Sequence, residues 1–323
     1  MRASTYLMGA RLARFGRCSI PIAGGCDFGS RPIDIHLKVF EDMGAVCDGR
    51  IISFPKGRVS VGEVSFSRVT VGGTVNALIA SALGSGKIVF HGCAIEPHVC
   101  DLARFLNACG AQIIGVGGGR TEVVGVAELH GCEFELSGDM IEAGTYLIMG
   151  AATRGRVRME GVKAEELSSL SDLLERMGCG VRNGVGFVRV EALGDLNCAF
   201  VETGVYPGFP TDLHPQIAAL MGTVRGSSGV TEAVYGASRF GYLDELRRFG
   251  VRFSVEGASV KIWGGRMTAS DVKAPDLRGG AALLTAALCA DGESRIRNGH
   301  FLERGYSGLS ERLRILEADI ERG

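Results

Sequence analysis

The chain has 323 residues, which predicts about two domains, and its 46% hydrophobic and 22% charged residues exclude a wholly disordered protein. With 35 basic and 36 acidic side chains its formal net charge is −1, which argues against a strongly basic nucleic-acid-binding protein. The 10 cysteines are scattered without a CxxC pair, and no apolar run reaches about 18 residues. We therefore expect reduced thiols, a cytoplasmic location and no membrane-spanning segment.

Glycine is unusually frequent, at 49 residues, and it marks a repeat. Gly44, Gly110, Gly178 and Gly250 each follow a predicted helix and precede a predicted strand, at intervals of 66 to 72 residues, and Glu317 takes the same place once more. Glycine just past a helix end is the usual left-handed cap, so the glutamate predicts a weaker fifth cap. The glycines have no three-residue period, which excludes collagen.

Each repeat unit also has an earlier helix of small apolar residues, expected over 77–83, 146–152 and 281–288. These helices are apolar nearly all round, which predicts that they are buried. A glycine turn and a short strand follow each of them, and glycine-rich hairpin tips are expected at 115–119 and 183–186. The unit therefore reads buried helix, strand, amphipathic helix, strand, hairpin, strand.

Five such units can be counted, the first clipped at its start and the other four complete. Several units must pack together, because a lone unit cannot bury its apolar helix. This predicts an inverted α/β arrangement with helices inside and sheets outside. Residues 133–139 are the expected junction, which divides the chain into an N-terminal domain of two units, 1–138, and a C-terminal domain of three units, 139–323.

The first candidate site is the glycine-rich loop 24–32, which contains Cys26 and Arg31. An arginine five residues from a cysteine can lower the pKa of the thiol, which suits a general acid or a nucleophile. The alternative is one incidental thiol among ten.

The second candidate is the run 206–212, which leads into a buried helix. Two prolines fix the backbone of the entering chain. Thr211 or Asp212 could cap that helix, which is a common role for either residue, or Asp212 could act as a base at the helix start.

The third candidate is a pair of arginines beside glycines in the last unit, Arg278 at the start of the buried helix and Arg304 at the start of the next. A guanidinium binds phosphate or carboxylate in a bidentate way, although surface arginines are common. A possible metal cluster has a spacing that matches no standard zinc pattern; its members are His91, Cys93, Glu96, His98 and Cys100.

Together these stretches resemble one family over essentially the whole chain, UDP-N-acetylglucosamine 1-carboxyvinyltransferase. The cysteine loop and the Gly-Phe-Pro-Thr-Asp run are quite specific, and both occur in order within the repeat. The matching segments are 1–4, 12–16, 24–36, 70–72, 96–97, 141–145, 208–212, 276–278 and 304–306.

The resemblance implies a fold of two inside-out, α/β-barrel-like domains built from six βαβαββ units around a cleft. It also implies a reaction in which the enolpyruvyl group of phosphoenolpyruvate moves to the 3'-hydroxyl of UDP-N-acetylglucosamine and phosphate is released. This is the first committed step of peptidoglycan synthesis, and it requires no metal or organic cofactor.

Residue roles follow from the same resemblance. Cys26 is similar to the proposed acid for the enol methylene, which phosphoenolpyruvate or fosfomycin can modify, Asp212 to the base near the sugar hydroxyl, and Asp276 to a residue that orients the site. The cluster around the phosphate and carboxylate of phosphoenolpyruvate corresponds to Arg2, Arg31, Arg278 and Arg304. The uridine diphosphate positions correspond to Pro32, Asp34, Ile35, Arg68, Thr70, Val71, Gly72 and Val234, and Arg239 corresponds to a further cleft arginine.

The chain also departs from the family pattern. Gly236-Ala237-Ser238 precedes Arg239 where the family has Glu-Asn, Pro215 lies in the helix after Asp212, and an earlier segment with a Lys-Asn pair is expected but absent. Five units therefore stand where six are expected. Two alternatives stay open: a non-catalytic nucleotide-sugar-binding relative, and the sister enzyme that acts on shikimate 3-phosphate, against which the cysteine loop and residues 31–34 argue.

Overall fold

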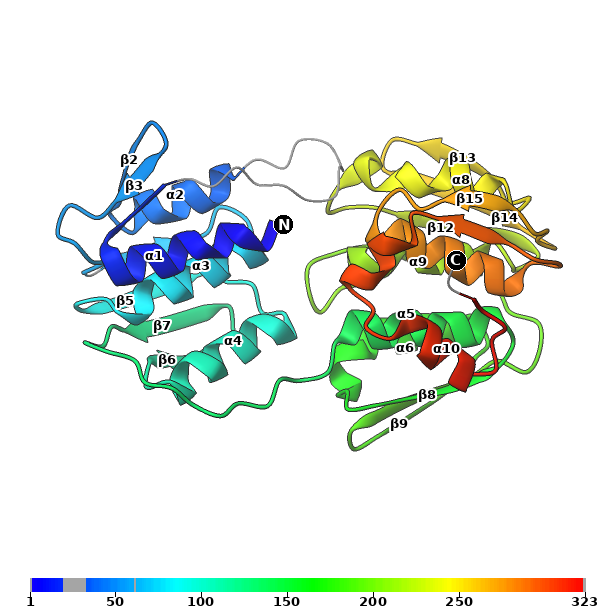
Figure 1. The fold of residues 1–323 in the computed structure, drawn as a ribbon, viewed down its shortest axis with the longest axis horizontal. Coiled ribbons are helices and arrows are strands. Elements are labelled where there is room, and N and C mark those ends of the chain that lie inside the picture. The colour runs from blue at the N-terminus through cyan, green and yellow to red at the C-terminus, as the bar shows by residue number, and fades with distance from the viewer. Residues whose placement is uncertain (1, 20–32, 61, 322–323) are drawn as a thin grey trace. The chain divides into compact units, whose positions relative to one another are not determined.

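The computed structural model describes residues 2–19, 33–60 and 62–321, and of residues 2 and 3 it describes the backbone alone. These residues divide into two compact units, with the change from unit 1 to unit 2 between Ser137 and Gly138. Both units are built from short strands and helices that alternate along the chain (Figure 1). No helix in the described ranges is long and apolar enough to cross a membrane.

Unit 1 contains two copies of the repeat. The first has a three-stranded antiparallel sheet in the order β1-β3-β2 and consists of η1 (Arg2–Tyr6), α1 (Leu7–Phe15), β1 (Arg17–Ser19), α2 (Asp34–Asp42), β2 (Val46–Asp48) and β3 (Ile51–Ser53). The second has a four-stranded sheet, β4-β5-β7-β6, and consists of β4 (Gly62–Ser65), α3 (Val71–Ala82), β5 (Lys87–His91), α4 (Pro97–Ala108), β6 (Gln112–Ile114) and β7 (Arg120–Val124). In that sheet β4 and β5 run parallel and the other neighbours antiparallel, which gives the predicted βαβαββ order.

Unit 2 contains three further copies. The first comprises α5 (Met140–Ala152), β8 (Arg156–Glu160), η2 (Ala164–Leu167), α6 (Ser168–Arg176), β9 (Gly180–Gly184) and β10 (Phe187–Glu191). The second comprises β11 (Phe200–Glu202), η3 (Thr211–Leu213), α7 (His214–Met221), β12 (Gly226–Thr231), η4 (Gly236–Tyr242), α8 (Leu243–Arg247), β13 (Arg252–Glu256) and β14 (Ser259–Gly264). The third comprises β15 (Asp271–Lys273), α9 (Leu277–Cys289), β16 (Arg295–Arg297), η5 (Gly299–Arg304) and α10 (Leu309–Ile315). The sheet orders are β8-β10-β9, β11-β12-β14-β13 and β15-β16.

The helix ends have the backbone that the glycine repeat predicts. Gly44, Gly110, Gly178 and Gly250 have φ angles of 89°, 99°, 95° and 90°, all in the left-handed region where a side chain is disfavoured. Glu317 adopts the same conformation, at φ 64°. The prediction that this helix end recurs five times is confirmed, and the fifth carries a side chain in a backbone conformation that favours glycine.

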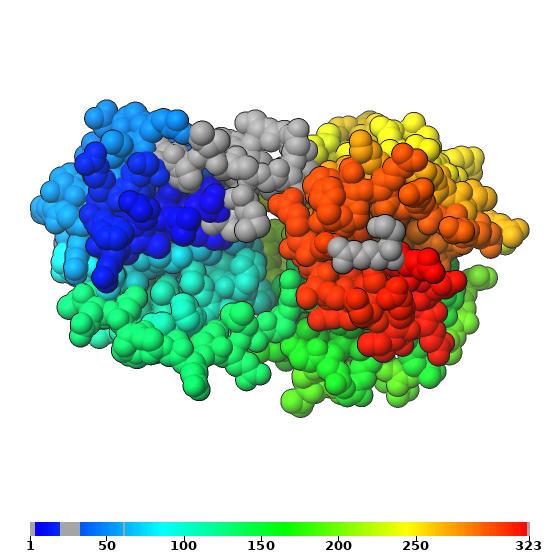
Figure 2. All heavy atoms as spheres, viewed as in Figure 1, coloured from blue at the N-terminus to red at the C-terminus, as the bar shows by residue number. Residues whose placement is uncertain are grey.

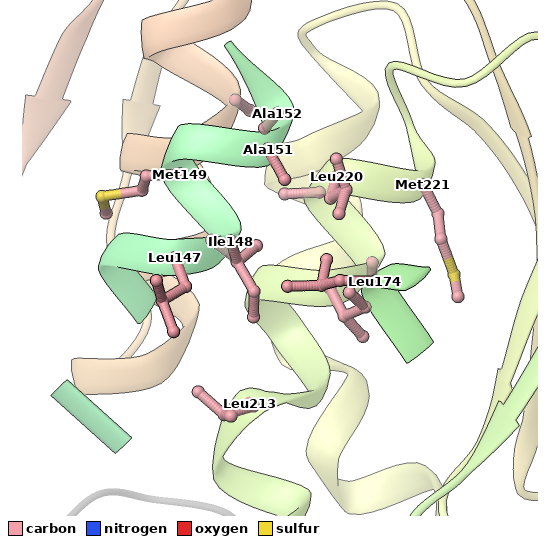
Figure 3. Packing of buried hydrophobic residues seen from close by; sticks show 14 of the residues in the cluster. Leu147, Ile148, Met149, Ala151, Ala152, Leu174, Leu213, Leu220 and Met221 are labelled. Carbon is pink, nitrogen blue, oxygen red and sulfur yellow. The ribbon is translucent and has the colours of Figure 1, made fainter. Parts of the chain in front are cut away.

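The apolar helices form the interior of each unit, as their sequences predict. Every residue of α7 is buried, and α5 is buried from Ala143 to its end. In unit 2 the helices α5, α7 and α9 contact one another, and Figure 3 shows side chains of α5 and α7 packed together with Leu213. Gly144 permits the close approach, because a Cβ there would lie 2.6 Å from Leu213 Cδ1. The inverted α/β arrangement is therefore confirmed.

Residues 125–139, which we call the connecting segment, join β7 to α5 and contain no helix or strand. The segment begins in unit 1 and ends in unit 2. Side chains along it are exposed or half-buried, and the atoms of this stretch lie at the surface in the space-filling view (Figure 2).

Candidate active site

A largely buried charged cluster of unit 2 surrounds Asp212. Asp212 Oδ1 accepts a hydrogen bond of 2.5 Å from Arg239 Nη2, and Asp212 Oδ2 accepts bonds of 3.1 Å and 3.3 Å from Arg278 Nη2 and Nε. The Arg239 and Arg278 side chains are 2% and 14% exposed, whereas the Asp212 side chain is 40% exposed. One carboxylate therefore faces solvent while two largely buried cations hold it from behind.

The opposite charges in this cluster determine the protonation states of Asp212 and Arg278. Burial alone would raise the pKa of Asp212, but the guanidinium groups of Arg278 and Arg239 outweigh it, and the pKa of the carboxyl lies below its usual value. Burial works in the opposite direction on Arg278, yet Asp212 and Tyr306 hold its pKa above the ordinary arginine value. Asp212 is therefore a carboxylate and Arg278 a cation throughout the physiological range.

Neither Thr211 nor Asp212 caps the helix that follows. Both η3 and α7 begin without a side-chain cap, because the Asp212 carboxylate is taken by arginines and Thr211 Oγ1 donates to Glu232 Oε2 at 2.9 Å. The capping alternative is therefore wrong. Pro215 lies in the first turn of α7, where a residue needs no backbone N–H for the helix, so this departure from the family pattern fits the helix start.

Asp276 places Arg278 through the backbone. It is the N-cap of α9, and its buried carboxylate accepts bonds of 2.9 Å from the backbone N–H groups of both Arg278 and Gly279. A carboxylate at this position satisfies two otherwise unpaired N–H groups, and the positive end of the helix dipole stabilises its negative charge. Asp276 thus fixes where the Arg278 side chain leaves the helix.

Tyr306 holds the other edge of the Arg278 guanidinium. Its hydroxyl accepts a bond of 3.0 Å from Arg278 Nη1 and one of 3.2 Å from Gln216 Nε2, and it donates to Thr145 Oγ1 at 3.1 Å. Thr145 Oγ1 in turn donates to Ile141 O at 2.8 Å, so each hydroxyl proton has one acceptor. These hydrogen bonds link α5, α7 and α9 through Tyr306 and hold the Arg278 guanidinium in place.

Glu232 is the second hub of the cluster, and its side chain is fully buried. Oε1 accepts hydrogen bonds from Thr203 Oγ1 and from the backbone N–H groups of Val234 and Tyr235, at 2.9 Å, 3.0 Å and 3.1 Å. Oε2 accepts from His214 Nδ1 at 2.8 Å as well as from Thr211. Burial alone would raise the pKa of Glu232, but these donors lower it to about 2, so the group is a carboxylate.

His214 is the matching neutral partner. Burial lowers its pKa more than Glu232 raises it, and its Nε2 lies 3.0 Å from the hydroxyl of buried Tyr242. The partners assign a proton to Nδ1, which donates to Glu232, while Nε2 accepts from Tyr242. Thr211 links Glu232 to the Asp212 cluster. Its hydroxyl donates to Glu232, and its carbonyl accepts hydrogen bonds of 3.2 Å and 3.0 Å from Arg239 Nε and Nη2.

Sequence reasoning missed Glu232, His214, Tyr306, Gln216 and Thr145 as members of this cluster. Each has at least one partner that is distant in the sequence, and the separation reaches 161 residues for Thr145 and Tyr306. The one available signal was polar residues within otherwise apolar helices, as at Thr145 and Gln216, which are 0% exposed. Fully buried polar side chains require partners, so their positions mark the network.

In unit 1 the predicted uridine diphosphate positions gather at the starts of two helices. Asp34 and Ile35 open α2, while Thr70 caps α3 with its Oγ1 accepting from Gly73 N at 3.4 Å. The two starts touch, because a Cβ on Gly72 would lie 2.6 Å from His36 Cε1. Helix starts carry free N–H groups and positive dipole ends, which favour phosphate. Val71 is partly buried in the first turn of α3, and Arg68 lies exposed just before it.

The remaining predicted residues stand apart from these contacts. Val234 is 42% exposed in the turn after Glu232, and Arg304 is exposed at the end of η5. Gly236 begins η4 with φ 57°, so the departure at Gly236-Ala237-Ser238 forms the first turn of the helix that carries Arg239. Cys26, Arg31 and Pro32 lie outside the described residues, as does the side chain of Arg2.

The possible metal cluster of unit 1 does not assemble. His91 Nε2 pairs with Glu63 Oε1 at 2.5 Å, and burial raises the pKa of the Cys93 thiol, which disfavours a thiolate ligand. Within the residues that the structure describes, no three His, Cys, Asp or Glu side chains are grouped so that they could hold a metal ion.

Comparison with known proteins agrees with this fold. Residues 1–313 match a family model described as EPSP synthase (3-phosphoshikimate 1-carboxyvinyltransferase). The chain thus belongs to the carboxyvinyl (enolpyruvyl) transferase family. Among solved structures it is similar to the enolpyruvyl transferase NikO from Streptomyces tendae, with a TM-score of 0.85 and 26% identity over 99% of this chain and 77% of that chain. EPSP synthase from Acinetobacter baumannii, at 16% identity and a TM-score of 0.71 over 97% of this chain and 77% of that one, shares the fold.

More similar sequences carry the name that the resemblance predicted. UDP-N-acetylglucosamine 1-carboxyvinyltransferase 3 of Caldanaerobacter subterraneus subsp. tengcongensis is 41% identical over 325 residues, which cover all of this chain and 78% of that protein. The UDP-N-acetylglucosamine 1-carboxyvinyltransferase of Paramagnetospirillum magneticum is 40% identical over 327 residues, which cover all of this chain and 76% of that protein. The predicted family resemblance is confirmed.

Proposed function

We propose that this protein transfers the enolpyruvyl group of phosphoenolpyruvate to the 3'-hydroxyl of UDP-N-acetylglucosamine and releases phosphate, the first committed step of peptidoglycan synthesis. The observation that carries the proposal is the solvent-facing Asp212 carboxylate held between Arg239 and Arg278. The relatives named above supply the substrate class. The cysteines that the structure describes are all free thiols, which supports a cytoplasmic location.

Arg278 is the cation that receives phosphoenolpyruvate. Arg239 is bound to both Asp212 and the Thr211 carbonyl and is almost fully buried, whereas Arg278 is more exposed and is anchored through its backbone by Asp276. The substrate carries about three negative charges, and charge moves toward its phosphate in the transition state, so fixed guanidinium groups stabilise that state. Arg2, Arg31 and Arg304 complete the proposed anion cluster.

The Asp212 carboxylate is the proposed base, and substrate binding adjusts its basicity. With two arginines bound, its low pKa makes it a weak proton acceptor. When Arg278 turns toward the phosphate or carboxylate of phosphoenolpyruvate, Asp212 loses one of its two cations and its pKa rises. The carboxylate can then accept the proton of the attacking sugar hydroxyl while Arg239 keeps it in place.

The other steps fall to groups of the cysteine loop and of unit 1. Cys26 delivers a proton to the enol methylene, which makes the neighbouring carbon electrophilic toward the sugar oxygen. The sugar oxygen adds to that carbon, and loss of phosphate and of a methyl proton then re-forms the carbon–carbon double bond, which leaves the enolpyruvyl group on the sugar as an enol ether. The starts of α2 and α3, with Asp34, Ile35, Thr70, Val71 and Gly72, hold the uridine diphosphate together with Pro32, Arg68 and Val234.

Phosphate release measured with the full-length protein tests the proposal. We expect release with phosphoenolpyruvate plus UDP-N-acetylglucosamine and none with shikimate 3-phosphate as the acceptor. Release with shikimate 3-phosphate alone would assign the sister activity, and tight binding of the nucleotide sugar without turnover would assign a non-catalytic relative. Fosfomycin should label Cys26, and Cys26→Asp should abolish the labelling; labelling that persists in this variant would remove Cys26 from the mechanism.

A further inference from the structure

Two cysteines of unit 1, neither of them among the residues proposed for catalysis, lie next to each other. Cys109 Sγ and Cys132 Sγ are 3.4 Å apart. Cys109 is buried at the end of α4, whereas Cys132 is exposed on the connecting segment. We propose that this pair is an oxidation site, at which a peroxide forms an intramolecular disulfide that ties the connecting segment to α4.

The backbone beside the two sulfurs holds them in register without any covalent bond. His130 N donates to the carbonyl of Cys109 at 2.9 Å, so the segment is bonded to the helix end two residues before Cys132. Gly110 allows the approach, since a Cβ there would lie 3.0 Å from the His130 ring. The main chain around Cys109 and His130 therefore determines that the two thiols lie next to each other.

Further contacts continue along the helix toward its start. Phe134 packs edge-on against Phe105 with ring centroids 5.6 Å apart. Ser137 N and Oγ each donate to the Asp101 carboxylate at 3.1 Å. The connecting segment thus runs antiparallel to α4 and touches it at successive turns, which keeps Cys132 over Cys109 and gives the two thiols a high effective concentration.

The chemistry needs only an oxidant of the peroxide class. The exposed Cys132 thiolate attacks a peroxide oxygen, the O–O bond breaks, and a sulfenic acid forms at Cys132 as hydroxide leaves and is protonated to water. The Cys109 thiol then loses its proton, its sulfur attacks the sulfenic sulfur, and a second water leaves as the S–S bond forms. Two thiols are oxidised and one hydrogen peroxide is reduced to two waters, and an external dithiol reverses the reaction.

The distance between the sulfurs and the chemistry of the thiols predict that the disulfide forms slowly and is reversible. A disulfide requires about 2.05 Å between sulfurs, so the pair must close from 3.4 Å by side-chain rotation. The hydrogen bond between Cys132 and Cys109 raises the pKa of the Cys132 thiol, so the reactive thiolate is scarce at neutral pH and the rate should increase as the solution becomes more alkaline. Disulfides that form in reducing compartments are usually transient of this kind.

Peptide mapping after peroxide treatment tests the proposal on the full chain. Trypsin cleaves after Arg104, Arg120 and Arg154, so the two cysteines fall in separate peptides, 105–120 and 121–154, each without another cysteine. After hydrogen peroxide, alkylation without reduction and digestion, we expect these peptides joined and lighter by two hydrogen atoms. Treatment with dithiothreitol should return both as single alkylatable peptides.

Two variants separate the proposal from general thiol oxidation. Cys109→Ser should remove the crosslink and leave a sulfenic acid on Cys132 that dimedone traps. Cys198→Ser, which removes another exposed thiol, should leave the crosslink unchanged. If the wild-type peptides stay unjoined at a peroxide dose that oxidises Cys198, or if Cys132 joins many other cysteines equally, the proposal is wrong. Neither result bears on the transferase activity, because none of these cysteines belongs to the proposed active site.

Discussion

Asp212 and Arg239 are joined by a hydrogen bond of 2.5 Å in which the acceptor is accessible and the donor is not, with side-chain exposures of 40% and 2%. A cation buried in this way is stable only while its counterion and its other acceptors remain. Arg239 is thus committed to the protein, and Asp212 is the member of the pair that can meet a substrate.

Asp212→Asn should abolish most of the activity while the fold persists. The amide keeps one acceptor oxygen for an arginine but cannot take the proton of the sugar hydroxyl, so kcat should fall by about 10²- to 10⁴-fold. Phosphate release measures the rate, and circular dichroism checks the fold. Asp244→Asn, which removes an exposed carboxylate paired with Arg247, is the control and should retain full activity. Near-normal turnover by the Asp212 variant would exclude this residue as the base.

Tyr306→Phe should weaken the hold on Arg278 without removing its charge. The variant loses the hydroxyl that binds Arg278 Nη1 at 3.0 Å, while Asp212 and Asp276 still contact the arginine residue. We expect KM for phosphoenolpyruvate to rise several-fold and the free energy of unfolding to fall by about 1 kcal/mol, the usual contribution of one hydrogen bond. Tyr146→Phe removes another buried tyrosine hydroxyl of unit 2, and KM should not change. Equal effects of the two variants on KM would mean that Tyr306 acts through stability alone.

Local sequence was sufficient for the repeat but not for the site. Gly178 could be read as a helix end because a left-handed residue after a helix is a local requirement of the backbone. The function of Asp212 depends instead on Arg239 and Arg278, which lie 27 and 66 residues away, so its own neighbours in sequence could not decide between a cap and a base. Glu232 gave no signal at all, because one acidic residue after a strand is typical of a solvated turn. The family resemblance identified the arginines, and only the three-dimensional contacts identified Glu232.

Glu232→Gln should change how stability depends on pH. The pKa of Glu232 in the folded protein, about 2, lies below its ordinary value of 4.5, so its contribution is complete above about pH 4.5 and is lost as the pH falls toward 2. A shift of this size corresponds to about 3 kcal/mol. Glutamine cannot ionise, so the variant should lose roughly that stability at pH 7 and show a flatter decline in acid.

Urea unfolding measured between pH 7 and pH 3 would show this effect. Glu63→Gln, which alters an exposed carboxylate paired with His91, is the matched control and should follow the wild-type curve. His214 adds to the same trend, because a neutral buried histidine with a lowered pKa also loses stability as the unfolded chain becomes protonated below about pH 6.5. If the free energy of unfolding falls with equal slope below pH 4.5 in the wild type and in Glu232→Gln, Glu232 is not ionised in the folded protein.

Glu317→Gly should stabilise the protein, which is an uncommon direction for a single change. Glu317 has φ 64°, the left-handed conformation that glycine adopts at the other four helix ends, and a side chain there costs about 1 kcal/mol. The variant removes that strain, so the free energy of unfolding should rise by about 0.5 to 1 kcal/mol.

Gly178→Ala makes the reverse change at φ 95°, with Asn197 Nδ2 3.3 Å from the new Cβ, and should destabilise by about 1 kcal/mol or more. Gly194→Ala, where a Cβ meets nothing within 4 Å and φ is not left-handed, controls for the added methyl group and should be close to neutral. If Glu317→Gly lowers the midpoint of thermal unfolding while Gly178→Ala behaves as stated, side-chain contacts of Glu317 outweigh its backbone strain and the fifth helix end is not equivalent to the others.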